Sequence, residues 1–229
     1  PVHPPARRGG CLAIIEYKGF GGFRLSVDVL GDENDPAVLL LPEPGQGREV
    51  WRAAAEALVL SGRRVVNVEP RASAIEAGDI AAHVEDLRAI LAQMGSRPVV
   101  ATARRGGLVA TQALAPDGAH LAAGLILVDM PVSDEAVAAA PRLALPTLVV
   151  RGGFSPAECT AASDAFAAAL PIGESADIED RDLAFAVDRN EALLGQLLEF
   201  LERRQPREAM EFKAGSDPRT LRDAMGCFA

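Results

Sequence analysis

The sequence is poor in the side chains that form disulfide frameworks, metal sites and membrane spans. Its 229 residues include three cysteines and three histidines. The cysteines, Cys11, Cys159 and Cys227, are odd in number, far apart and without CxxC spacing, which argues against a disulfide framework or a zinc site. No apolar run reaches about 18 residues, the length that a membrane-spanning helix needs. We therefore expect a metal-free protein of the reducing cytoplasm.

Excess positive charge is also missing. The chain has 23 lysine and arginine residues against 32 aspartate and glutamate residues, a net charge of −9. An acidic surface repels phosphate backbones, so we expect no nucleic-acid partner. Hydrophobic residues make up 49% of the chain and charged residues 24%, which favours a sizeable core over disorder. The length suits one α/β domain with at most a tail.

The first forty residues predict a loose leader followed by a β-hairpin. Residues 1–10 form the leader, and residues 12–17 and 23–30 alternate polar and apolar side chains, as strands do. The glycine-rich residues 19–22 join these two strands. Residues 37–41 are wholly apolar, which is typical of a strand buried on both faces of a parallel sheet.

Beyond residue 41, short apolar runs alternate with amphipathic stretches. The predicted strands cover residues 64–68, 98–101, 121–128, 147–150 and 175–178, and the predicted helices cover residues 50–60, 80–94, 106–114, 156–170 and 190–201. Such alternation predicts βαβ units and a mostly parallel sheet with helices on both faces. We assign residues 11–204 to this domain and residues 205–229 to a linker and the start of another element.

Five local strings, taken in order, resemble the α/β-hydrolase superfamily. LLLPEPG (39–45) stands where the family carries a strand followed by His-Gly, and EPRASA (69–74) is similar to the Asp-x-Arg-Gly-x-Gly loop. TARRGG (102–107) stands in place of the nucleophile elbow. PTLVVRGG (146–153) resembles the strand before the catalytic acid, and DRN (188–190) precedes the last helix. The resemblance implies an α/β-hydrolase fold. Its cap domain is absent or minimal, because only residues 130–145 intervene where many members insert one.

The same resemblance implies a catalytic triad, and none of its three residues is present. Arg104 stands in the nucleophile position, Pro156 in that of the acid and Leu183 in that of the histidine. A guanidinium stays protonated and cannot attack a carbonyl. Pro44 stands where a backbone N–H of the oxyanion hole is expected, and proline has none. Asp129, at the end of a predicted strand, is an alternative acid, although a loop carboxylate is the simpler interpretation.

The remaining candidates for base and nucleophile are few. No histidine follows His120, which precedes a predicted strand and suits a turn; His83 lies in the predicted helix 80–94, and we expect it on the surface. His3 belongs to the leader. Thr102 is a hydroxyl near the elbow, but we expect it on the strand side of the turn.

Three functions stay open at this stage. The first is an inactive domain with an interaction or scaffold role, in which Arg104 pairs with Glu43 and fills the vestigial site. The second is an esterase-like or haloperoxidase-like hydrolase that uses Thr102, Ser155 or Cys159. The third is a small-anion-binding module, in which Arg104, Arg105 and Arg71 bind a carboxylate or phosphate at a helix N-terminus.

The C-terminal residues carry a second resemblance. DPRTLRDAMGCFA (217–229) is similar to the opening of a flavin reductase-like domain, in which such a helix leads into the first strand of an FMN-binding split barrel. This implies a downstream flavin reductase module as a partner, with FMN or FAD bound there and no cofactor in this chain.

Overall fold

A computed structural model describes residues 12–71, 80–115, 118–152, 157–178 and 191–206. Its centre is an eight-stranded sheet in the order β1-β2-β4-β3-β5-β6-β7-β8. The strands are β1 (Ala13–Lys18), β2 (Arg24–Leu30), β3 (Ala37–Leu41), β4 (Arg64–Val68), β5 (Val99–Ala103), β6 (Gly124–Val128), β7 (Thr147–Gly152) and β8 (Gly173–Ile178). β2 pairs antiparallel with both β1 and β4, and all other neighbours are parallel.

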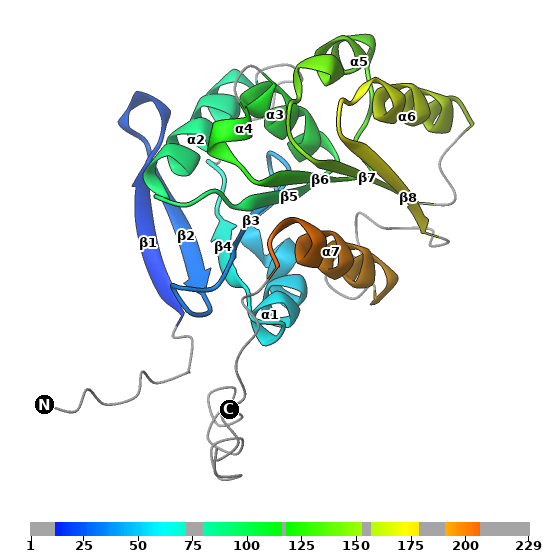
Figure 1. The fold of residues 1–229 in the computed structure, drawn as a ribbon. Helices are drawn as coiled ribbons and strands as arrows, with labels where there is room; N and C mark the ends of the chain where they lie inside the picture. Colours follow the sequence, from blue (N-terminus) through cyan, green and yellow to red (C-terminus); the bar gives the residue numbers. More distant parts are fainter. Residues whose placement is uncertain (1–11, 72–79, 116–117, 153–156, 179–190, 207–229) are drawn as a thin grey trace, which may run out of the picture.

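Helices cover both faces of the sheet (Figure 1). They are α1 (Arg52–Leu60), α2 (Ala81–Gln93), α3 (Arg105–Leu114), α4 (Gly118–Leu121), α5 (Asp134–Ala139), α6 (Ala157–Ala169) and α7 (Glu191–Arg204), with 3-10 turns η1 (Phe20–Gly22), η2 (Arg48–Trp51) and η3 (Ala140–Arg142). α1 and α7 pack on one face of the sheet, and α2, α3, α5 and α6 pack on the other. None of the helices in the described ranges is long and apolar enough to cross a bilayer.

Two apolar clusters explain why these strands sit at the centre. Alternate residues of β3 belong to different clusters: Val38 and Leu40 pack with α1 and α7, whereas Leu39 and Leu41 pack with α2 and α3. All five residues of β3 are buried, as are all five of β6. The predicted fold is therefore confirmed, including the antiparallel N-terminal hairpin and the buried strand at residues 37–41.

Two details differ from the sequence prediction. β6 begins at Gly124, three residues later than predicted, because Gly118–Leu121 forms the short helix α4. The stretch 130–145 was predicted only as a short connection, but it contains α5 and η3. The Ser133 hydroxyl caps α5 by accepting a hydrogen bond from Ala136 N at 3.3 Å. α5 packs beside α6 and α3, so the connection stays close to the body of the protein.

Candidate functional site

The turn between β5 and α3 has the backbone shape of a nucleophile elbow. Arg104 lies between the last residue of β5 and the first residue of α3, with φ 49° and ψ −126°. A non-glycine residue rarely adopts this conformation, which costs of order 1–3 kcal/mol. Hydrogen bonds fix the turn, since Arg104 N donates to Val128 O at 2.8 Å and Gly107 N donates to Arg104 O at 2.9 Å. The strained turn thus holds Arg104 between β5 and α3, the position that the sequence analysis predicts for a nucleophile.

Small residues after Arg104 let the helix approach the sheet closely. A Cβ atom on Gly107 would lie 2.6 Å from Cγ of the buried Met130, and one on Gly106 would clash with Oγ1 of Thr102. The Thr102 hydroxyl is itself fully buried and donates to Leu41 O at 2.8 Å. Thr102 therefore lies on the strand side of the turn, as predicted, and its proton is committed to a backbone carbonyl.

A carboxylate lies against the backbone N–H that follows Arg104. In this kind of elbow, the backbone N–H that follows the nucleophile binds the developing oxyanion. Here that N–H belongs to Arg105, and it donates to Oε2 of Glu43 at 3.4 Å. The second donor is missing at the predicted position, because Pro44 has no N–H. The carboxylate of Glu43 therefore lies on the backbone N–H that begins α3.

A shallow hollow at this edge of the sheet is lined by Glu43, Arg104, Arg105, Asp129 and Pro131. Asp129 follows β6 with a φ of 46°, and its Oδ1 accepts a hydrogen bond from Gly152 N at 2.8 Å. Two arginines and two carboxylates thus share one surface, so their charges balance. Glu43 contacts the N-terminus of α3 through the backbone N–H of Arg105, and its ion pair with Arg104 stays a prediction.

Arg71 lies apart from this hollow, contrary to its predicted place in an anion site. Its guanidinium donates to both oxygens of Asp86, at 2.6 and 2.7 Å, and to Phe20 O at 3.0 Å. The hydrogen bonds that Arg71 donates to Asp86 raise the pKa of Arg71, so its guanidinium stays protonated. Asp86 is buried and also accepts from Phe20 N at 2.7 Å. This group ties the N-terminal hairpin to α2.

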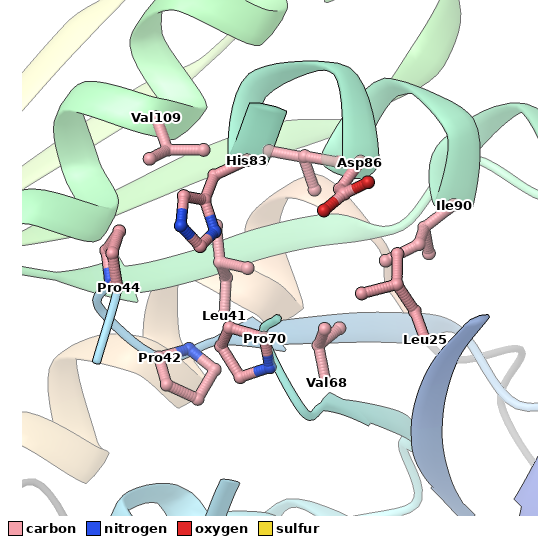
Figure 2. Close-up of a pocket in the computed structure, with 11 residues that line it drawn as sticks. Leu25, Leu41, Pro42, Pro44, Val68, Pro70, His83, Asp86, Ile90 and Val109 are labelled. Atoms are coloured by element: carbon pink, nitrogen blue, oxygen red, sulfur yellow. The ribbon is translucent and has the colours of Figure 1, made fainter. Parts of the chain in front are cut away.

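His83 is buried rather than exposed, which makes the surface prediction wrong. It is 6% exposed and lies on the inner face of α2, next to Val84 and Leu87. Figure 2 shows its ring pointing from α2 toward Leu41 and the prolines of the β3 loop. It lines a cavity of about 10 Å³, the size of one water molecule. None of the described residues that line this cavity carries a hydroxyl or a thiol.

The other histidine in the described ranges lies far from the elbow. His120 is exposed on α4, which precedes β6, whereas Arg104 follows β5. β5 and β6 run parallel, so His120 lies near the amino ends of these strands and Arg104 lies at their carboxyl ends. Several predicted positions lie outside the described residues: Pro156, Leu183 and Ser155, the side chain of Cys159, the leader 1–10 and residues 217–229.

Comparisons with known proteins agree on the fold. The sequence matches no protein-family model and no curated protein. Among solved structures, the chain is similar to Rv0554 from Mycobacterium tuberculosis (15% identity, 83% of this chain and 100% of that chain, TM-score 0.73). It is also similar to a predicted CIB-like hydrolase from Thermoplasma acidophilum (18% identity, 85% of this chain and 100% of that chain, TM-score 0.73). A third similar structure is an esterase from Rhodococcus sp. (17% identity, 84% of this chain and 100% of that chain, TM-score 0.66). The chain has the α/β-hydrolase fold.

Within the α/β-hydrolase fold, the sequence located the elbow but not the contacts around it. The contact between Glu43 and the N–H of Arg105 has no local signal, because 62 residues separate the two. The buried ion pair of Asp86 with Arg71 did have a local signal in the sequence. Asp86 shares a helix face with His83, among Val84, Leu87 and Ile90, and a carboxylate on an apolar face needs a buried partner.

Proposed function

We propose that this chain is an α/β-hydrolase-fold domain that does not hydrolyse and instead serves interaction or scaffolding. The observation that carries the proposal is Arg104 in the strained elbow turn. A permanently protonated side chain cannot act as nucleophile or accept a proton from one. Glu43 adds a second obstacle, because its carboxylate lies on the backbone N–H that would bind an oxyanion. Losing one such donor alone typically slows hydrolysis about 10²–10³-fold.

Ester turnover by the full chain tests this proposal. We expect the wild type and an Arg104→Ala variant to hydrolyse p-nitrophenyl acetate and butyrate no faster than buffer, because neither has a nucleophile at the elbow. A working esterase assayed in parallel sets the detection limit. Turnover by the wild type that Arg104→Ala abolishes would overturn the proposal. Equal turnover by both proteins would move attention to a site elsewhere in the chain.

A hydrolase with non-standard residues is the second candidate, and the neighbouring structures favour it. Solved structures of similar fold include esterases and a putative non-heme bromoperoxidase from M. tuberculosis. Ser155 and Cys159 follow β7, where the fold carries its acid, and are the remaining nucleophiles to test. A fluorophosphonate or iodoacetamide adduct on either residue, lost in Ser155→Ala or Cys159→Ala, would support this candidate. Intact-mass spectrometry measures it directly.

Binding of a small anion by Arg104 and Arg105 is less favoured. The carboxylates of Glu43 and Asp129 line the same hollow and would repel an anionic ligand. If the hollow nevertheless binds anions, phosphate or acetate should raise the melting temperature of the wild type. The Arg104→Ala variant should then lose this shift.

We also propose a flavin reductase-like module as the partner of the scaffold. Residues 217–229 support this by their resemblance to the opening of such a domain, and the cofactor, FMN or FAD, would belong to that module. Titration calorimetry of this chain with FMN should therefore give no heat of binding. Saturable binding to this chain alone would contradict the assignment.

A further inference from the structure

We draw no further inference here: the strongest candidate, the exposed apolar patch on the edge strand β1 and its hairpin turn (Leu12, Ile14, Ile15, Phe20 and Phe23), carries none because nothing in the described part of the structure shows what covers it.

Discussion

Replacing Arg104 with glycine should stabilise the protein. The φ of 49° and ψ of −126° at Arg104 cost a non-glycine residue about 1–3 kcal/mol, whereas glycine adopts them freely. Against this gain, glycine adds about 0.5–1 kcal/mol of unfolded-state entropy. Loss of the contacts of a half-buried guanidinium costs up to about 1 kcal/mol. The net expectation is a gain of about 1 kcal/mol, or a melting temperature about 2–4 °C higher.

Urea unfolding of the wild type, Arg104→Gly and Arg105→Gly measures this effect. Arg105 begins α3 with ordinary helical backbone, so glycine there should cost up to about 1 kcal/mol. The two adjacent variants should therefore shift the midpoint in opposite directions at similar m-values. If both destabilise equally, the elbow stores no strain at Arg104 and the reasoning fails.

Two further substitutions, with Gly195→Ala as a control, test the packing of α3 and the Arg71–Asp86 ion pair, and urea unfolding measures all three. Gly107→Ala should destabilise the protein by about 1–3 kcal/mol, because the added Cβ would press on Met130. Gly195→Ala, whose Cβ would meet nothing within 4 Å, should stabilise α7 by about 0.5–1 kcal/mol. Equal effects of the two substitutions would contradict the close approach at Gly107. Asp86→Ala should cost about 3–5 kcal/mol, because it leaves the Arg71 guanidinium half-buried without its carboxylate; a loss below about 1 kcal/mol would contradict the role of this pair.

The sequence predicted the elements whose signals are local. The wholly apolar residues 37–41 predicted a doubly buried strand, and the strand-to-helix junction at Arg104 predicted the elbow. The absence of any histidine after His120 argued against a catalytic base, and this argument needed no alignment. These features depend on residue type and on spacing along the chain, which a single sequence contains.

The errors concern contacts between distant segments. His83 was expected on the surface because its helix is amphipathic, but the face it occupies is covered by the loop that follows β3. Arg71 was assigned to the anion site, and instead it pairs with Asp86, 15 residues away. The contact of Glu43 with the backbone N–H of Arg105 was not predicted at all, because 62 residues separate the two. Which partner a charged side chain takes depends on tertiary geometry, and no local pattern specifies it.

The measurement closest to the central claim is the rate of ester hydrolysis by the intact 229-residue chain, beside an Arg104→Ala variant prepared identically. The account predicts that both rates equal the buffer rate, since a guanidinium occupies the elbow. A wild-type rate well above buffer that disappears with Arg104 would contradict it.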